Sequence, residues 1–320
     1  MGEPAGIGAE IAAAAWARGS PPFFLIGDAE AVAGPVVRIK APEQAAAAHP
    51  HGLPVLHRPL AARPVPGRLD PANAPAVIAS IEEAVALARA GRVSAVVTLP
   101  IQKSVLTGAG FAHPGHTEFL HALAPEAVRP VMLLASDALR VVPVTIHEPL
   151  ARAIARLTTA MIVETARITA AGLIRDFGIA APRLAVAGLN PHAGEAGTMG
   201  HEDQAIVAPA VATLRALGLD ARGPLPPDTM FTALARPRMD CAICLYHDQA
   251  LIPIKTLDMD GGVNVTLGLS IIRTSPDHGT ALDIAGQGVA SPNSLIAALR
   301  LAARLAANRG PRGNTACAFQ

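Results

Sequence analysis

The sequence predicts an α/β protein with a largely parallel sheet. Short apolar runs of strand length alternate along the chain with segments whose apolar residues recur at helical spacing. The chain has 320 residues, of which 51% are hydrophobic, so it can bury a large core. Its length alone corresponds to about two domains.

The helical segments are recognised by their periodicity and their ends. Residues 74–90 carry apolar side chains at helical spacing, and Gly91 can end that helix. Residues 149–178 are predicted to form one long helical region closed by a glycine. Residues 203–217 and 291–307 are expected to be helices as well.

The predicted strands are residues 93–98, 140–146, 183–189 and 241–245. Parallel sheets bind ligands beyond the carboxyl ends of their strands. The loops after these strands are therefore the first place to look for a site, and three of the four carry a histidine.

These histidines are His147, His192 and His247. Neutral imidazole is the commonest metal ligand, and three such ligands leave open positions for a substrate. No local spacing such as H-E-x-x-H supports the assignment, and three unrelated polar loop histidines are the alternative. The equivalent topological positions favour a metal site.

The cysteines have a simpler interpretation. Cys241 and Cys244 form a C-x-x-C, which can indicate zinc or redox chemistry, but they share a strand-like run and no second pair accompanies them. Two buried apolar cysteines are favoured. With Cys317 in an apparent tail, the odd count and the lack of a signal peptide predict a reducing cytoplasm.

Composition argues against two classes of partner. The formal net charge is +1 and aromatic residues make up 3%, so neither a basic surface nor stacking platforms for nucleic acid are expected. No uninterrupted apolar stretch of about 18 residues occurs, which predicts no membrane span.

A set of polar residues indicates an anion site. Thr117, after His116 in "GHTEF", can cap a helix, and a helix start with free N–H groups favours phosphate. Lys255, Asn264 and Arg273 punctuate an otherwise apolar segment, and arginine grips phosphate or carboxylate with two hydrogen bonds. The alternatives are an ordinary cap and solvated surface charges.

Two glycine-bearing segments are candidate ligand loops. "GEPAGIGAE" (2–10) resembles a phosphate loop but fits no phosphate-binding or dinucleotide-binding pattern. His278, Gly279 and Thr280 open the segment 277–294 and offer polar groups with close backbone approach.

Eight blocks, in this order, resemble the 4-hydroxythreonine-4-phosphate dehydrogenases, the oxidoreductases of vitamin B6 biosynthesis. The resemblance covers nearly the whole chain and rests on "GEPAGIG", "LPIQKSVLTGAGF", "GHTEFL", "VTIHEPL", "GLNPHAGEAGTMGHED", "PLPPDTMF", "YHDQALIPIK" and "GVNVTLGLSIIRTSPDHGTALDIAG".

The resemblance implies a fold and its ligands. The expected fold has two α/β/α domains like those of isocitrate and isopropylmalate dehydrogenases, with the active site in the interdomain cleft at a dimer interface. The expected domains are residues 1–117 plus 270–320, on the cofactor side, and 118–269, for metal binding and dimerisation. The family works as a homodimer whose metal site is shared between subunits, and it uses NAD or NADP without a Rossmann fold.

The resemblance also implies site residues. One divalent metal, Zn²⁺, Co²⁺ or Mg²⁺, is expected on His147, His192 and His247. The substrate is expected on His116, Thr117, Lys255, Asn264 and Arg273. Cofactor contacts are expected from His278, Gly279, Thr280 and Asn190.

The implied reaction is the oxidation of 4-phosphohydroxy-L-threonine to 2-amino-3-oxo-4-phosphooxybutanoate, which decarboxylates to 3-amino-2-oxopropyl phosphate. Asp228 and Lys255 are the expected catalytic residues, Asp228 as a partner of the site or proton acceptor. Asp248 is expected to orient His247.

Three alternatives stay open. A sister dehydrogenase acting on 4-phospho-D-threonate, or on a 4-phospho-D-erythronate-type substrate, keeps the metal and phosphate sites. A metal-dependent phosphohydrolase releases phosphate without NAD. A non-catalytic phosphometabolite-binding protein needs no metal.

The sequence departs from the family at its start. Family members begin with a strand that runs into "GEPAGIG", whereas this chain begins at Met1 on the loop itself. We expect that the native start lies upstream or that the sheet lacks one strand, which would expose its neighbour's edge.

Overall fold

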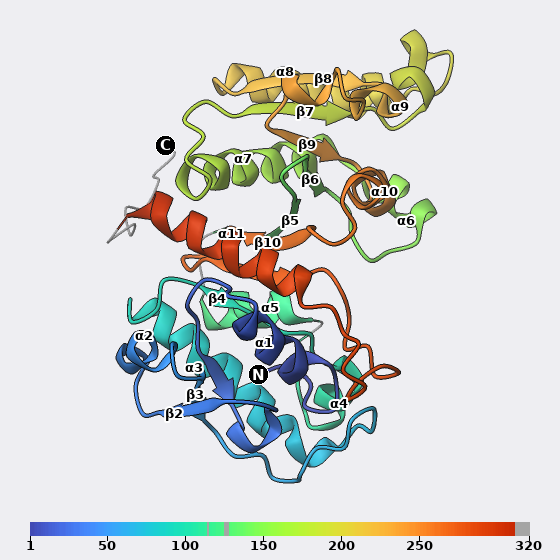
Figure 1. Ribbon diagram of the computed structural model, residues 1–320. Helices are drawn as coiled ribbons and strands as arrows, with labels where there is room; N and C mark the ends of the chain where they lie inside the picture. The colour runs from blue at the N-terminus through green and yellow to red at the C-terminus, as the bar shows by residue number, and fades with distance from the viewer. Residues whose placement is uncertain (114, 125–127, 311–320) are drawn as a thin grey trace. The chain divides into compact units, whose positions relative to one another are not determined.

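The computed structural model describes residues 1–113, 115–124 and 128–310, which form two compact units (Figure 1). Unit 1 comprises Met1–Pro130 and Leu269–Ala307, and unit 2 comprises Val131–Gly268 and Asn308–Gln320. The sequence placed the first boundary after residue 117, thirteen residues before Pro130. Helix α5, which begins after residue 115, buries Phe119 and Leu120 in a cluster of unit 1. Cys317 lies outside the described residues.

Unit 1 contains the amino-terminal elements and the last strand and helix. Its strands are β1 (Leu25–Gly27), β2 (Val36–Ile39), β3 (Leu53–His57), β4 (Val96–Val97) and β11 (Arg273–Pro276). Its α-helices are α1 (Gly8–Ala17), α2 (Ala45–Ala48), α3 (Ala74–Arg89), α4 (Lys103–Gly108), α5 (His116–Leu123) and α11 (Asn293–Arg309). Short 3₁₀ turns are η1 (Ala29–Ala31), η2 (Pro42–Gln44) and η3 (Pro71–Asn73).

The strands of unit 1 pair in two parallel groups. One sheet has the order β1-β3-β2, and β4 pairs with β11. Helix α3 contacts both β1 and β4. A second core cluster joins Ile11 of α1, Leu53 of β3 and Leu299 of α11. Helices therefore connect the two groups through apolar contacts.

Unit 2 contains the middle of the chain. Its strands are β5 (Val131–Ala135), β6 (Arg140–Pro143), β7 (Arg183–Ala187), β8 (Asp220–Leu225), β9 (Cys241–Cys244) and β10 (Val263–Leu267). Its α-helices are α6 (Leu150–Arg156), α7 (Thr159–Arg175), α8 (Ala208–Ala216), α9 (Pro227–Met230) and α10 (His247–Leu257). Irregular helical turns are η4 (Pro191–Gly197), η5 (Asp203–Val207) and η6 (Arg236–Arg238).

The strands of unit 2 lie in the order β10-β5-β6-β9-β7-β8. The pairings among β6, β9, β7 and β8 are all parallel, while β5 is antiparallel to both of its neighbours. The prediction of an α/β protein with largely parallel sheets is thus confirmed.

Alternation along β9 distributes its side chains between two layers. Ala242 and Cys244 pack in a cluster with Ala250 and Ile254 of α10, and Cys241 and Ile243 point to the opposite face. Helix α7 contacts β9 as well (Figure 1). Apolar contact on both faces explains why this strand is an unbroken apolar run.

Cys241 and Cys244 are free thiols on this buried strand. Burial raises the pKa of Cys241 to about 12 and the pKa of Cys244 well above its usual range. Among the residues that the structure describes, no group of three or more His, Cys, Asp or Glu side chains is arranged to hold a metal. Both side chains have no exposed surface, so the two cysteines of the C-x-x-C pack in the core, as the sequence favoured.

The predicted helical region 149–178 is two helices, and the prediction of one long helix was wrong. Thr158 adopts an extended backbone, and its side chain accepts a hydrogen bond from the N–H of Met161, which caps α7. The axes of α6 and α7 differ in direction by 95°. A local capping bond here overrides the continuous helical pattern.

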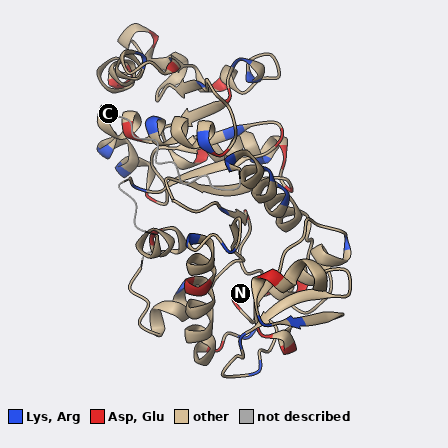
Figure 2. Ribbon diagram, turned by 90° about the vertical axis from the view of Figure 1, so that its left-hand side faces the viewer, with Lys and Arg blue, Asp and Glu red and all other residues tan. Residues whose placement is uncertain are grey.

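No single helix within residues 1–113, 115–124 and 128–310 is long and apolar enough to cross a membrane. The bent pair α6 and α7, taken together, reaches the length and apolar composition of a membrane span, by those two properties alone. Lysine and arginine positions are interspersed with aspartate and glutamate in both units (Figure 2). This mixture matches the formal net charge of +1.

Truncation of Ile243 tests the two-faced burial of β9. Ile243 has no exposed surface, so Ile243→Ala should lower the free energy of unfolding by about 2–5 kcal/mol. Leu217→Ala is the matched control, because Leu217 is 53% exposed and its loss should stay within about 0.5 kcal/mol. Urea unfolding followed by circular dichroism measures both, and equal losses would contradict this packing.

Candidate active site

Two of the predicted metal ligands lie side by side in unit 2. Strands β6 and β9 pair in parallel with Pro143 opposite Cys244, and His147 and His247 come after these strands. The Thr145 hydroxyl donates to the Leu245 carbonyl at 2.8 Å, which ties the two strand ends together. The imidazole centroids are 5.7 Å apart. The parallel register thus brings together two residues one hundred positions apart in sequence.

The tautomer of His247 is fixed by its neighbour. His247 Nδ1 lies 2.6 Å from Asp248 Oδ1, as expected if Asp248 orients the ring. An Nδ1–H that donates to a carboxylate leaves the Nε2 lone pair available. His247 can therefore bind a cation through Nε2 while Asp248 holds its ring.

The third histidine occupies an unusual loop. His192 lies in η4, after β7, where the backbone adopts a left-handed conformation from His192 to Ala196. Asp203, which is 1% exposed, holds the start of this loop. Its carboxylate accepts hydrogen bonds from the backbone N–H groups of Leu189 at 2.7 Å and Asn190 at 3.0 Å.

The expected set of three histidines is not assembled within one chain across residues 1–113, 115–124 and 128–310. His192 is exposed, and it lies in the loop after β7 whose start is hydrogen-bonded to Asp203. The pair His147 and His247 fits two of the three ligands of a metal such as zinc, since its imidazoles are adjacent and one tautomer is set.

Asp228 and Asn190 lie near this loop, Asp228 with an exposed side chain and Asn190 with a hydrogen-bonded one. Asp228 is an exposed residue in the first turn of α9, a helix that contacts η4. The side-chain amide of Asn190 donates to Glu202 at 2.8 Å and to Asp203 at 3.1 Å. Asn190 thus stabilises its own loop through hydrogen bonds, whereas the sequence predicted a contact with the cofactor.

The expected substrate residues divide between the units. Lys255 lies in the last turn of α10 and Asn264 in β10, both half-buried in unit 2. His116 and Thr117 lie at the start of α5, and Arg273 opens β11, all three in unit 1.

Helix α5 begins two residues earlier than a Thr117 cap would require. Gly115 is the N-cap, with an extended backbone, and its carbonyl accepts from the N–H of Phe119 at 3.2 Å. The expectation that Thr117 caps this helix was therefore wrong. Thr117 lies in the first turn, where its hydroxyl and the free N–H groups still favour an anion.

His116 and Arg273 form an electrostatically coupled pair in unit 1. Arg273 is buried, and its Nε and Nη2 donate to the Thr98 hydroxyl at 3.1 and 2.7 Å. Burial lowers the pKa of Arg273 to about 10, so it remains charged at neutral pH. Burial, then the Arg273 charge and the Met1 amino group, lower the pKa of His116 well below its usual value of 6.5.

The His116 ring is therefore neutral at pH 7. The residue keeps partial exposure, yet its Nε2 is buried and has no hydrogen-bond partner among the residues that the structure describes. A neutral ring with an unpartnered nitrogen beside a buried guanidinium is suited to bind an anionic ligand.

The segment expected to bind the cofactor packs against the glycine-bearing loop of unit 1. The Thr280 carbonyl accepts from the Ile7 N–H at 3.1 Å, and its hydroxyl lies 3.3 Å from Gln102 Oε1. A Cβ on Gly6 would lie 2.8 Å from the Thr280 carbonyl oxygen, so only glycine permits this approach. In "GEPAGIG" Gly6 thus serves backbone packing.

His278 retains a free position for a ligand. Its Nδ1 lies 3.0 Å from the Gly279 carbonyl, and its buried Nε2 has no hydrogen-bond partner within residues 1–113, 115–124 and 128–310. An orphaned buried nitrogen fits a nucleotide that offers a hydrogen-bonding group at this place.

Two supporting residues, Thr98 and Asp203, escaped the sequence interpretation. Thr98 comes directly after strand β4 and accepts from Arg273, and Asp203 closes the block "GHED". Their partners are far away in sequence or are backbone amides, which leave no motif. A polar residue directly after an apolar strand was the one available signal for Thr98.

Comparison with known proteins gives a consistent result. The model of the family "Pyridoxal phosphate biosynthetic protein PdxA" matches residues 22–302. The 4-hydroxythreonine-4-phosphate dehydrogenase of Bradyrhizobium diazoefficiens is 56% identical over 330 residues, covering 96% of each chain. The crystal structure of the enzyme of that name from Klebsiella pneumoniae superposes with a TM-score of 0.87 at 38% identity, covering 96% of both chains.

A structure with a different activity is similar too. A terephthalate 1,2-cis-dihydrodioldehydrogenase from Burkholderia xenovorans is 32% identical, covers 95% of this chain and 96% of its own, and gives a TM-score of 0.65. The same fold therefore carries dehydrogenases for phosphorylated and unphosphorylated substrates, and the substrate has to be argued from the site.

Removal of Asp203 should loosen the loop that carries His192. Asp203→Ala leaves two backbone N–H groups without their acceptor, so we expect a loss of about 2 kcal/mol or more in the free energy of unfolding. Hydrogen exchange at the amides of Leu189 and Asn190 should accelerate. Asp220→Ala is the control, because Asp220 forms an exposed ion pair whose loss should cost less than about 0.5 kcal/mol.

The low pKa of His116 predicts a pH dependence of stability. The unfolded chain takes up a proton near pH 6.5, whereas the folded ring resists it, so stability is full above about pH 6.5 and falls below it. His116→Gln should reduce this acid loss, by at most about 1.4 kcal/mol per pH unit. Urea unfolding at about pH 7.5 and 5.5 measures it. A wild-type slope in His116→Gln would refute the assignment.

Proposed function

This chain belongs to the family of pyridoxal phosphate biosynthetic proteins PdxA, and we propose that it oxidises 4-phosphohydroxy-L-threonine with NAD or NADP. The product, 2-amino-3-oxo-4-phosphooxybutanoate, is a β-keto acid that loses CO₂ to give 3-amino-2-oxopropyl phosphate. The observation that carries the proposal is the His147–His247 pair at the ends of two parallel strands. The proposal is also supported by the 56% identity between this chain and the 4-hydroxythreonine-4-phosphate dehydrogenase of Bradyrhizobium diazoefficiens, over 96% of each chain.

His116, Thr117 and Arg273 are the proposed phosphate ligands. The Arg273 guanidinium supplies positive charge from a buried position, the neutral His116 ring supplies one N–H, and the Thr117 hydroxyl adds a donor. Lys255 and Asn264 are proposed to bind the remaining polar groups of the substrate. A buried cation favours an anionic group on the substrate, and a phosphate supplies one with several acceptor oxygens.

His147 and His247 are proposed to hold a divalent metal, and His278, Gly279 and Thr280 to contact the cofactor. When bound, the metal lowers the pKa of an alcohol and the nicotinamide accepts a hydride. Within the chain, Asp248 keeps the His247 ring in place, and Asp228 is the proposed acceptor of the hydroxyl proton.

The decarboxylation step needs a cation more than a base. The hydroxyl carbon loses its hydride and the oxygen loses its proton, which leaves a ketone β to the carboxylate. The carbon–carboxylate bond then breaks, CO₂ leaves, and the electron pair forms an enolate that later takes up a proton. Lys255 is proposed to stabilise that negative charge.

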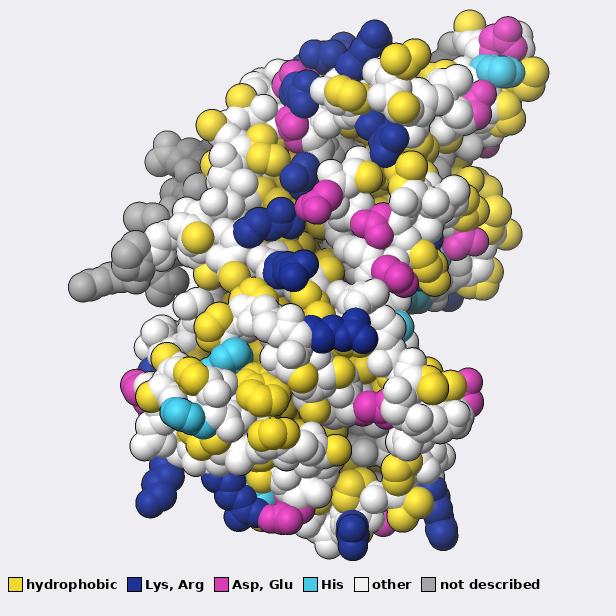
Figure 3. Space-filling model, viewed as in Figure 1, with side chains coloured by type: hydrophobic (Ala, Val, Ile, Leu, Met, Phe, Trp, Pro, Cys, Tyr) yellow, Lys and Arg dark blue, Asp and Glu magenta, His cyan; other side chains and the backbone are white. Residues whose placement is uncertain are grey.

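A second copy of the chain is proposed to complete the metal site with its His192. His192 is exposed and lies in a loop that is held by Asp203 apart from the His147–His247 pair. Leu150 and Ile154 on α6 and Ile252 on α10 are between 40% and 64% exposed. Hydrophobic side chains are visible among the surface atoms of unit 2 in Figure 3. Such surfaces favour association. The reduced thiols of β9 agree with a cytoplasmic location.

NADH formation from 4-phosphohydroxy-L-threonine, followed by absorbance with and without a chelator, tests the proposed activity. His247→Ala should lower kcat/KM by about 100-fold or more and reduce bound metal, while the exposed His51→Ala should change neither. Faster turnover of 4-phospho-D-threonate would assign the sister activity. Phosphate release without NAD would replace the proposal with hydrolysis.

Mixing two inactive variants tests the shared metal site. His192→Ala and His247→Ala each lack one ligand, but a mixed dimer holds one complete site. Random exchange should therefore restore about a quarter of the wild-type activity and of the bound metal. No recovery after verified exchange of subunits would contradict a site shared between copies.

A further inference from the structure

Two side chains hold the end of strand β9 on its two sides. The Leu245 carbonyl accepts from the Thr145 hydroxyl at 2.8 Å, on the side of β6. The Leu245 N–H donates to Gln249 Oε1 at 2.6 Å, and Gln249 Nε2 donates to the Gly188 carbonyl at 2.8 Å, on the side of β7. These hydrogen bonds join the ends of three neighbouring strands, β6, β9 and β7, and each of these ends leads to one candidate histidine.

The backbones of β7 and β9 stop pairing just before this bridge. Their parallel register ends with Val186 opposite Ile243. Gly188 and Leu245 each lie two residues further on, so the same register, continued, sets them opposite each other. The Gln249 amide lies between these two backbone groups and supplies a donor to one and an acceptor to the other. It thus acts as a spacer at the point where the loop after β7 leaves the sheet.

Burial makes both hydrogen bonds of this amide important. Gln249 is 6% exposed, so a donor or acceptor lost here is not replaced by bulk water. The glutamine carboxamide offers an N–H donor and a carbonyl acceptor from one planar group, which neither glutamate nor methionine does at neutral pH. Its orientation is fixed as well, since its oxygen must face the N–H of Leu245 and its nitrogen the carbonyl of Gly188.

The position of Gly188 bears directly on the turn that carries His192. A Cβ on Gly188 would lie 2.8 Å from the Cβ of Ala193, the residue after His192, so these two residues are in close contact. The N–H of Gly188 also donates to the Leu225 carbonyl at 2.7 Å. A displacement of Gly188 would therefore move Ala193 and His192, while Asp203 acts on the two residues that follow Gly188.

We propose that Gln249 is a positioning residue of the metal site, which fixes the origin of the His192 loop relative to the ends of β6 and β9. The proposal rests on the metal-binding role proposed above for His147, His192 and His247. His192 then extends from a loop that is tied to Leu245, the residue two positions before His247. In a dimer with shared sites, this bridge links the ligand that a chain offers to its partner with the pair that it keeps.

The test measures Zn²⁺ affinity with Gln249→Met in two backgrounds. Methionine is of similar length but forms neither hydrogen bond. In the otherwise unchanged chain, Gln249→Met should weaken Zn²⁺ binding by about 10-fold or more, as the loss of a residue that orients a ligand does. In the His192→Ala background the same change should alter the affinity by less than about two-fold, because the ligand through which Gln249 acts is gone. Titration calorimetry measures both. A similar loss in both backgrounds, or no loss in either, would overturn the proposal.

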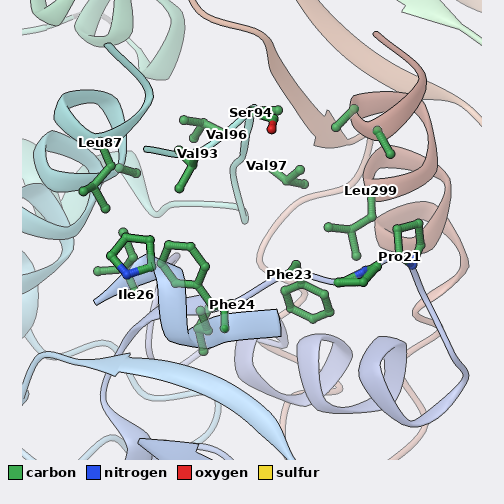
Figure 4. Close-up of a pocket in the computed structure, with 18 of the residues that line it drawn as sticks. Pro21, Phe23, Phe24, Ile26, Leu87, Val93, Ser94, Val96, Val97 and Leu299 are labelled. Atoms are coloured by element: carbon green, nitrogen blue, oxygen red, sulfur yellow. The ribbon is translucent and has the colours of Figure 1, made fainter. Parts of the chain in front are cut away.

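Two core truncations separate positioning from a general loss of stability. Leu173→Ala removes a fully buried side chain of α7 in unit 2. Leu87→Ala removes a buried side chain of α3 in unit 1, where Leu87 lines an apolar cavity (Figure 4). Both should lower the free energy of unfolding and leave the Zn²⁺ affinity within about two-fold of the wild type. A loss of affinity in either control as large as that of Gln249→Met would count against positioning.

The metal-free protein gives a readout that does not depend on the proposed function. In Gln249→Met, the imidazole Cε1–Hε1 resonance of His192 and the amide resonance of Ala193 should shift. Hydrogen exchange at the Leu245 amide should accelerate, because its buried acceptor is lost.

Gln249→Glu separates the two hydrogen bonds of the amide. Its carboxylate keeps an acceptor for the Leu245 N–H but has no donor for the Gly188 carbonyl at neutral pH. It should therefore preserve slow exchange at Leu245 and still shift the His192 resonance. Accelerated exchange at Leu245 with an unmoved His192 resonance would contradict the positioning role.

Failure of the proposed function would give a different result. Unaltered Zn²⁺ affinity in both His192→Ala and His247→Ala would remove the metal site, and the resonances of the metal-free protein would then decide the role of Gln249. Unchanged His192 and Ala193 resonances in both Gln249 variants would overturn that role.

Discussion

The parallel pairing of β6 with β9 is the constraint on which the candidate metal site depends. Strand residues in register deliver the loops after them to one edge of the sheet, and the hydrogen bond from Thr145 to the Leu245 carbonyl extends that register past the strand ends. The two imidazoles then meet at 5.7 Å without any local sequence spacing. A shift of one residue in this pairing would turn one of the rings to the other face.

The loops that carry these histidines bear backbone strain. His147 has a φ of 48° and His192 a φ of 54°, a region that costs non-glycine residues on the order of 1 kcal/mol or more. Such conformations persist where surrounding bonds enforce them, as Asp203 does for the second loop. Ala193, Glu195 and Ala196 share the left-handed conformation of His192, so the direction in which the second loop presents its histidine is set by a run of such residues.

Features that rest on local patterns could be predicted from the sequence, and features that depend on distant partners could not. Apolar runs marked β6, β7 and β9 and the histidines after them, because a doubly covered strand leaves a continuous signal. The break at Thr158 rests on one capping hydrogen bond inside an otherwise helical pattern, and the role of Asp203 rests on bonds from distant backbone amides, which leave no pattern in the sequence. The three-residue β1 was missed since it is too short to show a period. The division of the histidines into a pair and a separate His192 depends on a loop held by a residue eleven positions further on.

In unit 1, burial acts on the candidate anion site through the charge and the pKa values of its side chains. A buried guanidinium at Arg273 is retained because Thr98 accepts from it, and its charge helps to keep His116 neutral. A phosphate would therefore meet one fixed charge and neutral donors, so its binding would not weaken as pH rises through the usual histidine range. The two residues of this pair that exchange hydrogen bonds, Thr98 and Arg273, lie on neighbouring strands: Thr98 directly follows β4 and Arg273 opens β11. The parallel pairing of β4 with β11, which places Arg273 opposite Val96, is therefore the backbone constraint on which the anion site depends.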